Sequence, residues 1–493
     1  MQKNITVERH KVYVVLFTAI AYVCWLFFYM FCESYSEIPS LTITIVSILG
    51  TLTVIVYEVI WWRIVGKLLT PINIFLAFFV VFNFGQCLLW AVGIHSDSEI
   101  GQKLVFNTLN AQNITILQSQ LLFIICFITL NCGALLAWNR KQNVHLTPIR
   151  NEKNANDIRY RALFYTSLIL SIVVVPVTLY NSFHILNLSM IYGYSSLYNG
   201  VAQSMLFGNM VNILLQLFFP CLLGLLIGSR YDKWCRIVVY GIFLIFAVTR
   251  LLSGDRGEWV NLLVFLFLAE YYFYKKYSGR ALIVFTIFGI FALIIIDSVV
   301  SMRNTGLSWD GFVSALTDVD SNPIVSMLLE FGHSMGISML LIAYDITFPY
   351  GNSYLMSIPT LMGTGLFNRI FGMDYVQIHT WFPKYLGISY GTDFSMIGEA
   401  ILNCGVYVAP FVILLEGFII AKIAVLPYRK NIGPLGLCLS LSIMAYTVKI
   451  ARSTVWLVSM NIIYMIIFSV SYYVVMCLLT SKKKKWTRKQ EVV

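Results

Sequence analysis

The sequence is poor in charge. Asp, Glu, Lys and Arg make up 12% of its 493 residues, whereas hydrophobic residues make up 59% and the mean hydropathy is +0.78. A soluble domain carries about 25% charged residues, so this composition excludes an ordinary soluble protein. We expect no signal peptide, because the first apolar run lacks a cleavage site of small residues and is long enough to cross a membrane.

Two further patterns are missing. The ten cysteines include no C-x-x-C pair and no Cys/His cluster, so we expect neither disulfides nor a metal site. They lie mostly inside apolar runs and are interpreted as small buried hydrophobic residues. The net charge of +11 does not indicate a nucleic-acid partner, because the basic residues lie where membrane topology places them.

Apolar runs, in contrast, are abundant. Runs of about 20 residues recur along the chain, and this length crosses the hydrocarbon core of a bilayer as a helix. They predict an all-α polytopic integral membrane protein of about twelve transmembrane helices. The expected spans are roughly 12–32, 41–60, 72–94, 114–137, 161–185, 205–228, 236–252, 257–274, 281–300, 395–421, 432–451 and 455–480.

Lysine and arginine set the predicted sidedness, since cytoplasmic loops carry an excess of both. With both termini in the cytoplasm, most of the 34 basic residues fall on the inner side. The chain then divides into nine spans over 1–300, a long extracytoplasmic loop over 301–394, three spans over 395–480 and a basic cytoplasmic tail over 481–493.

The loop 301–394 is far longer than an ordinary connection, and loops of that length are usually functional. It is rich in aromatic residues and contains a helical pattern over 323–346. Pro323 suits the first turn of that helix. Counting the segment as a span would break the alternation of basic loops, so we expect a helix that lies in or on the outer leaflet or is re-entrant.

Residues 253–257, Ser-Gly-Asp-Arg-Gly, join two apolar runs on the predicted outer side. Gly254 suits the left-handed end of one helix, and Asp255 with Glu258 forms a capping box for the next. Arg256 fits neither role, because the helix dipole disfavours a cation at the first turn. An ion pair with Asp255 or Glu258 is one explanation of Arg256, and an anion site is the other.

Further cations belong to the same predicted membrane face. Arg250 lies near the end of its span, where a charge is usually paired or functional. Arg303 follows the ninth span, and Lys449 and Arg452 share a helix face because they are three residues apart. Since guanidinium groups suit phosphate oxygens, these residues and Arg256 predict a site for a phosphate-bearing lipid headgroup.

Acid–base candidates also occur in the outer segments. Glu330 and His333 are three residues apart in the helical pattern, and His379 lies further along the loop. A histidine near its ordinary pKa is the commonest general base. Glu399 lies at the outer mouth of the tenth span and needs a partner there, for which Arg303 or Arg452 would serve. The sequence leaves the choice of base among these four residues open.

Twelve spans, the S-G-x-R-G turn at 253–257 and the long outer loop resemble the Wzy-type polymerases of O-antigen or capsule repeat units, which are similar in architecture to the O-antigen ligases. The resemblance implies a metal-independent glycosyltransferase of the bacterial cytoplasmic membrane, without a cofactor. It acts at the outer leaflet on glycans linked to undecaprenyl pyrophosphate. Arg256 matches the arginine of the turn, whereas Arg303 and His333 match by position alone.

The same resemblance implies membrane lipid and a chain-length regulator protein as partners, and no nucleic acid. In this interpretation Arg256, Arg303, Arg250, Arg452 and Lys449 bind the pyrophosphate. His333 or Glu399 is the base, with His379 or Glu330 in reserve, and the loop aromatics stack on sugar rings. A flippase of the lipid-linked oligosaccharide and an O-antigen ligase are the alternative functions.

Overall fold

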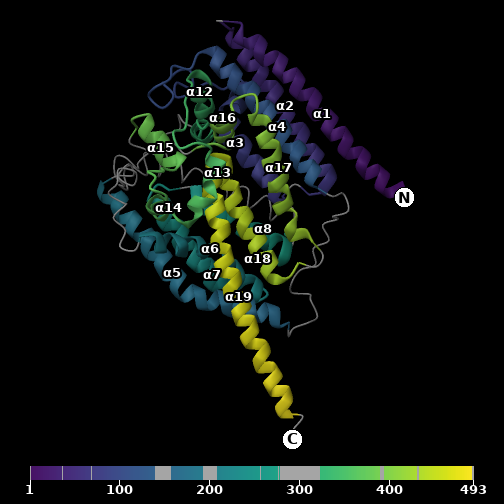
Figure 1. Cartoon of the computed structure of the whole chain (residues 1–493), viewed down its shortest axis with the longest axis vertical. Coiled ribbons are helices and arrows are strands. Elements are labelled where there is room, and N and C mark those ends of the chain that lie inside the picture. The colour runs from purple at the N-terminus through teal and green to yellow at the C-terminus, as the bar shows by residue number, and fades with distance from the viewer. Residues whose placement is uncertain are drawn as a thin grey trace. The chain divides into compact units, whose positions relative to one another are not determined.

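The structure is a computed structural model, and it describes residues 2–35, 37–67, 69–138, 157–192, 208–255, 257–275, 277, 322–388, 394–429 and 432–490. In this part of the chain the regular structure is helical, apart from isolated β-bridges at Ile100–Lys103 and Val105–Leu109 (Figure 1). The first eight helices are α1 (Gln2–Glu33), α2 (Ser40–Val65), α3 (Pro71–Ala91), α4 (Asn113–Ala137), α5 (Ile158–Tyr192), α6 (Gly208–Gly228), α7 (Lys233–Leu252) and α8 (Gly257–Phe273).

The helices that follow residue 322 are shorter on average. They are α11 (Pro323–Gly332), α12 (Met335–Ala343), α13 (Ser353–Ser357), the 3₁₀ turn η4 (Pro359–Met362), α14 (Thr364–Phe371), α15 (Ile378–Tyr385), α16 (Met396–Cys404), α17 (Ala409–Ala424), η5 (Leu426–Tyr428), α18 (Pro434–Thr447), η6 (Val448–Arg452) and α19 (Val455–Gln490).

Ten helices among the described residues are long and apolar enough to cross a membrane. Nine of them coincide with expected spans. The tenth is Ile324–Ala343, which the charge alternation assigned to a helix that lies in or on the outer leaflet or is re-entrant. Two expected spans appear as shorter apolar helices, Ile213–Gly228 and Trp259–Phe273, and the expected span 281–300 lies outside the described residues. The prediction of an all-α polytopic membrane protein is confirmed.

Apolar side chains cover the outside of several helices. Phe27 of α1, Leu52 of α2, Ile172 of α5 and Leu478 of α19 are each at least half exposed. In water such surfaces would be costly, but lipid tails cover them without penalty. These helices therefore have the surface expected of membrane spans.

The chain forms two compact units. The first contains Met1–Val144, Ser321–Val425 and Thr447–Ser459, and the second contains His145–Asp320, Leu426–Tyr446 and Met460–Val493. In the first unit α4 packs closely on α17. A Cβ atom added to Gly133 would lie 1.9 Å from the Leu414 carbonyl oxygen, and one on Gly417 would lie 2.2 Å from that of Leu130. The two glycines thus allow backbone contact, as small residues do between membrane helices.

Two expected helices of the first unit are interrupted. The pattern over 323–346 forms α11 and α12, which are separated at His333 and Ser334. The expected span 395–421 forms α16 and α17, because Gly405 at a φ of 78° ends α16 in a conformation that other residues rarely adopt. Hydropathy missed both breaks, since neither interrupts the apolar run.

In the second unit, α5 packs on α6. A Cβ on Gly224 would lie 2.0 Å from the Ser167 hydroxyl oxygen, so here too a glycine permits the close approach. The Tyr446 hydroxyl of α18 donates a hydrogen bond to the Gln216 carbonyl oxygen at 2.9 Å. This bond ties α18 to α6 across 230 residues of sequence.

Candidate functional site

The charged hairpin between α7 and α8 lies in the second unit. Gly254 ends α7 with a φ of 85°, and the Asp255 carboxylate accepts a hydrogen bond from the backbone N–H of Gly257 at 3.2 Å. The turn and the capping role of Asp255 are therefore as the sequence predicts. The Trp259 indole N–H also donates to the Asp255 carbonyl oxygen, at 3.0 Å, and steadies the start of α8.

Arg250 is largely buried in the last turn of α7, and its Nη1 lies 3.3 Å from Oδ2 of Asp255. Asp255, which the sequence offers as one ion-pair partner of Arg256, is thus paired with Arg250. Arg256 and Arg303, the two residues expected to hold the pyrophosphate, lie outside the described residues. Their assignment stays a prediction.

A second group of candidates lies in the first unit, around Arg452. Its guanidinium carbon is 5.4 Å from the ring centre of Phe82 in α3 and 5.4 Å from that of Phe331 in α11. The two rings meet edge to face, with their centres 5.3 Å apart. Ring faces attract a cation, so the two aromatic residues hold Arg452 in a defined orientation at the end of η6.

Asparagine 83 fixes the backbone beside Arg452. Its Nδ2 donates to the Ala451 carbonyl oxygen at 3.1 Å. This buried side chain of α3 therefore holds η6, although the two residues are 368 apart in sequence. Lys449 is half-buried on the same 3₁₀ turn. The predicted proximity of Lys449 and Arg452 in the helical turn is therefore present in the structure.

His333 and Glu330 lie at the end of α11, where the chain breaks before α12. Gly332 packs so closely on α3 that an added Cβ would lie 2.5 Å from the Gln86 backbone nitrogen. The Gln86 side chain donates to the Leu329 carbonyl oxygen at 3.0 Å. The glycine contact and this hydrogen bond fix the end of α11, and the His333 ring lies 5.1 Å from that of Phe106.

Glu399 is the most buried of the predicted acid–base residues, with 1% of its surface exposed. Its Oε1 accepts a hydrogen bond from the Ser353 hydroxyl at 2.7 Å, and its Oε2 accepts one from the Val455 backbone N–H at 2.8 Å. α16 lies outside the helices long enough to cross a membrane. Burial raises the pKa of the Glu399 carboxyl to about 7, although both hydrogen bonds act in the opposite direction.

His379 of α15 packs against Trp456, with ring centres 5.9 Å apart. Trp456 follows Val455, the residue that binds Glu399, and comes four residues after Arg452. The short segment 447–459 therefore contacts three predicted acid–base regions, through Phe331 next to Glu330, through Glu399 and through His379. The candidate residues of the first unit therefore lie around this one segment.

Sequence reasoning missed the residues that surround Glu399. The Asn403 amide donates to the Ser353 hydroxyl oxygen at 2.8 Å and accepts from the Ser353 backbone N–H at 2.6 Å. Burial and the nearby Glu416 and Glu399 carboxylates hold the pKa of the Tyr354 hydroxyl well above its usual value. Single small polar residues give no signal in a hydropathy pattern, so this network could be found only in the structure.

Several aromatic residues of the segment 344–385 pack on one another. Phe348 lies 5.1 Å from Trp381 and 6.2 Å from Tyr375, and both Phe348 and Tyr375 are buried. Tyr385 and Tyr344 are about half exposed, at 55% and 45%. The segment therefore has a small aromatic core of its own, and these two tyrosines are accessible from outside it.

All ten cysteines are free. Cys87, Cys126, Cys221 and Cys438 are buried, as expected of small hydrophobic residues, whereas Cys24 and Cys477 are exposed. Within the described ranges, no group of three or more His, Cys, Asp or Glu residues is placed to hold a metal ion.

Comparison with known proteins gives one match of nearly full length. A family model described as O-antigen polysaccharide polymerase Wzy matches residues 12–485, a range that contains every candidate site residue. No curated protein matches the chain, and no solved structure does.

Proposed function

Since the chain belongs to the O-antigen polysaccharide polymerase Wzy family, we propose that it joins lipid-linked oligosaccharide repeat units at the outer leaflet of the bacterial cytoplasmic membrane. A growing glycan leaves undecaprenyl pyrophosphate and is transferred to the non-reducing end of another lipid-linked unit. Both termini lie in the cytoplasm in this proposal, as the basic loops predict.

In the reaction, the bond between the anomeric carbon and the pyrophosphate oxygen breaks, and a bond to the acceptor hydroxyl oxygen forms. The pyrophosphate leaves with the bonding electron pair, so negative charge develops on it. Fixed cations stabilise such charge because they need not reorient during the reaction. Arg452, held between Phe82 and Phe331, is suited to this role, and Lys449 adds a second charge on the same turn.

The acceptor hydroxyl proton passes to a base. His333, Glu330 and His379 are each partly exposed and near the segment 447–459, whereas Glu399 is almost fully buried. A base must reach the substrate hydroxyl, so we assign that role to His333 first, with His379 and Glu330 as the other candidates. Glu399 acts as a positioning residue, since its bond to Val455 holds the segment that carries Arg452.

Arg256, Arg303 and Arg250 are further pyrophosphate-binding residues proposed from resemblance and charge, and Arg250 is already paired to Asp255. The exposed rings of Tyr385 and Tyr344 suit the apolar faces of sugar rings. A chain-length regulator is the proposed protein partner, and the reaction needs no metal or cofactor.

The observation that carries the assignment of residues is the contact of one short segment with Phe331, Glu399 and His379. Its test is Arg452→Gln, expressed in cells that lack the wild-type gene, with long surface polymer and lipid-linked single units both measured. Loss of one fixed cation at a charge-developing oxygen costs about 100-fold or more in rate, so long chains disappear and single units accumulate.

Lys384→Gln is the matched control, because Lys384 is an exposed cation of the same outer segment. It should leave the polymer unchanged. Normal polymer in Arg452→Gln at equal protein level would contradict the site assignment. A flippase would instead leave single units on the cytoplasmic side, and a ligase would leave long polymer on its lipid carrier.

A further inference from the structure

A polar cavity lies at the start of α7, in the turn that joins α6 to α7. The cavity has a volume of about 800 Å³ and is lined by Arg230, Lys233, Arg236 and several tyrosines. This volume is in the range of sites for small ligands, about 300–1,000 Å³. Since α7 has 20 residues and a helix rises about 1.5 Å per residue, the cavity and the Arg250–Asp255 hairpin lie at opposite ends of one candidate span.

The turn has an unusual backbone. Arg230 and Tyr231 both adopt left-handed conformations, with φ of 55° and 59°, which residues other than glycine rarely do. The Asp232 carboxylate is occupied at the start of α7, where it accepts from the backbone N–H of Trp234 at 3.0 Å. Asp232 also lines the cavity, but its carboxylate caps the helix, and three basic side chains share the lining.

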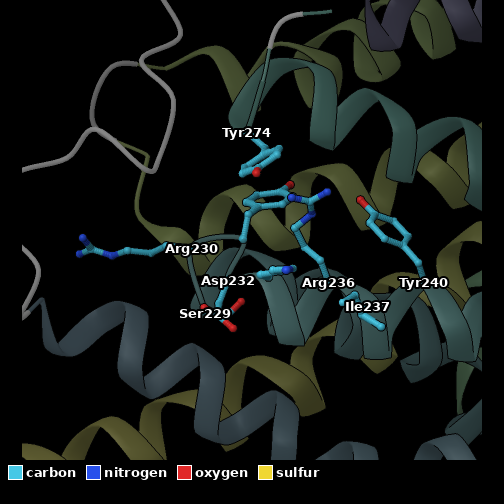
Figure 2. Close-up of a pocket in the computed structure, with 9 residues that line it drawn as sticks. Ser229, Arg230, Asp232, Arg236, Ile237, Tyr240 and Tyr274 are labelled. Carbon is cyan, nitrogen blue, oxygen red and sulfur yellow. The ribbon is translucent and has the colours of Figure 1, made fainter.

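Tyrosine rings orient the guanidinium groups. Arg236 lies 4.2 Å from the ring centre of Tyr274, which stacks on Tyr231, and Arg230 lies 4.5 Å from that of Tyr160. In Figure 2, Arg236 and Tyr240 extend from α7 towards the side of Tyr274, while Arg230 extends to the other side of the turn. A guanidinium stacked through its face presents its N–H groups at its edge, the geometry that suits phosphate oxygens.

Two polar atoms of the lining are buried without a hydrogen-bond partner among the described residues. They are the Tyr231 hydroxyl, on a side chain only 3% exposed, and Nε of Arg236. Glu270 satisfies other groups here, since it lies 3.5 Å from Nη2 of Arg236 and accepts from the Tyr240 and Tyr277 hydroxyls. Buried donors are nearly always satisfied, so these two indicate an acceptor-rich ligand.

The neighbouring surface is apolar. Ile237 lines the cavity and is 54% exposed, Trp234 on the preceding turn is 73% exposed, and Val238 is 56% exposed. Tryptophan is enriched where a membrane protein meets the headgroup level. Basic pockets of this kind, at the end of membrane helices on the cytoplasmic side, suit anionic headgroups.

We propose that this cavity binds the phosphate group of an anionic membrane lipid, on the side of the membrane opposite to the Arg250–Asp255 hairpin. Arg230, Lys233 and Arg236 supply the positive charge, and the Tyr231 hydroxyl donates to a phosphate oxygen. The acyl chains lie along Ile237 and Val238. The site is distinct from the proposed polymerisation site, and its test does not depend on polymer formation.

The experiment measures lipid retained by the full chain, purified in detergent, by native mass spectrometry. Phosphatidylglycerol and phosphatidylcholine with identical acyl chains are the probes, because only the first has net negative charge. We expect clear preference for phosphatidylglycerol. Arg230→Gln/Lys233→Gln should weaken its binding about 10- to 30-fold, since each basic residue near a headgroup contributes on the order of a fivefold effect.

Lys275→Gln/Arg429→Gln is the matched control, because it removes the same charge from exposed residues outside the cavity lining. It should change binding little. Tyr231→Phe should weaken phosphatidylglycerol binding a few-fold while the chain stays folded, as only a hydroxyl is lost.

Equal weakening by both double variants would overturn the proposal, because general surface charge would then explain the binding. If inorganic phosphate displaced the lipid at concentrations comparable to that of the lipid, the cavity would be a site for free phosphate and not for a lipid headgroup. Equal retention of the two lipids would overturn the requirement for an anionic headgroup.

Discussion

Glu399→Gln should change the stability of the protein in opposite directions at low and high pH. The wild-type carboxyl has a pKa raised from 4.5 to about 7 because it is buried. When the pKa of a carboxyl is higher in the folded than in the unfolded state, its protonated form stabilises the folded protein. That stabilisation is complete below the unfolded pKa and is lost as the pH rises through the folded pKa. The difference of roughly 2.5 pH units corresponds to about 3 kcal/mol, lost between about pH 4.5 and about pH 7.

Glutamine keeps the volume of the side chain but stays neutral at every pH. Its amide oxygen is able to accept from the Val455 N–H, and its amide nitrogen is then able to donate to the Ser353 hydroxyl oxygen, which already accepts from Asn403. This rearrangement costs about 1 kcal/mol. The variant should therefore be about 1 kcal/mol less stable than wild type near pH 4 and about 2 kcal/mol more stable near pH 8.

The assay is thermal unfolding of the full chain in detergent from about pH 4 to about pH 8, followed by tryptophan fluorescence. A change of 1 kcal/mol shifts the Tm by about 2–4 °C in a domain of about 150–250 residues. The Tm curves of wild type and Glu399→Gln should cross. Glu37→Gln, at an exposed carboxyl, should follow wild type throughout. Parallel curves for wild type and Glu399→Gln would refute the reasoning, since ionisation of Glu399 would then have no energetic cost.

Two other substitutions test different parts of the chain. Arg256→Ala, at unchanged protein level, should abolish long polymer and accumulate lipid-linked single units; normal chain length on a polysaccharide gel would show that this arginine does not bind the pyrophosphate. Gly417→Ala should destabilise the packing of α17 on α4 by about 1–3 kcal/mol, because the new Cβ would lie 2.2 Å from the Leu130 carbonyl oxygen. In Gly241→Ala the added Cβ would meet no atom within 4 Å beyond the adjacent helix backbone, so this variant should melt no lower than wild type. Equal melting of both variants would contradict the close approach of α4 and α17.

The fold class follows from sequence because its cause is local. A membrane helix satisfies its backbone hydrogen bonds within one segment, so the apolar run over 114–137 was sufficient to predict α4, which the structure gives as Asn113–Ala137. The turn at Gly254 and Asp255 is local in the same sense, because helix ends depend on a few adjacent residues. Predictions of this kind agree with the structure.

The candidate site depends on contacts between distant segments. Asn83 and Ala451 are 368 residues apart, and Ser353 meets Glu399 across 46. Nothing in the sequence around Glu399 specifies Val455 as its partner; we expected an arginine there, and the structure supplies a backbone N–H and a hydroxyl. Which partner a buried carboxyl obtains is decided by how helices pack, and that packing involves side chains from the whole unit.

The sequence by itself determined a polytopic helical membrane protein, the hairpin at 253–257 and the residue types available for phosphate and proton chemistry. Only the tertiary structure decided where helices break inside apolar runs, as at His333 and Gly405, and which residues the segment 447–459 contacts. The physical reason is the distance along the chain over which each interaction acts. Lipid exposure and helix ends act over one or two turns of chain, whereas burial of Glu399 and orientation of Arg452 require surfaces that meet only when the unit is folded.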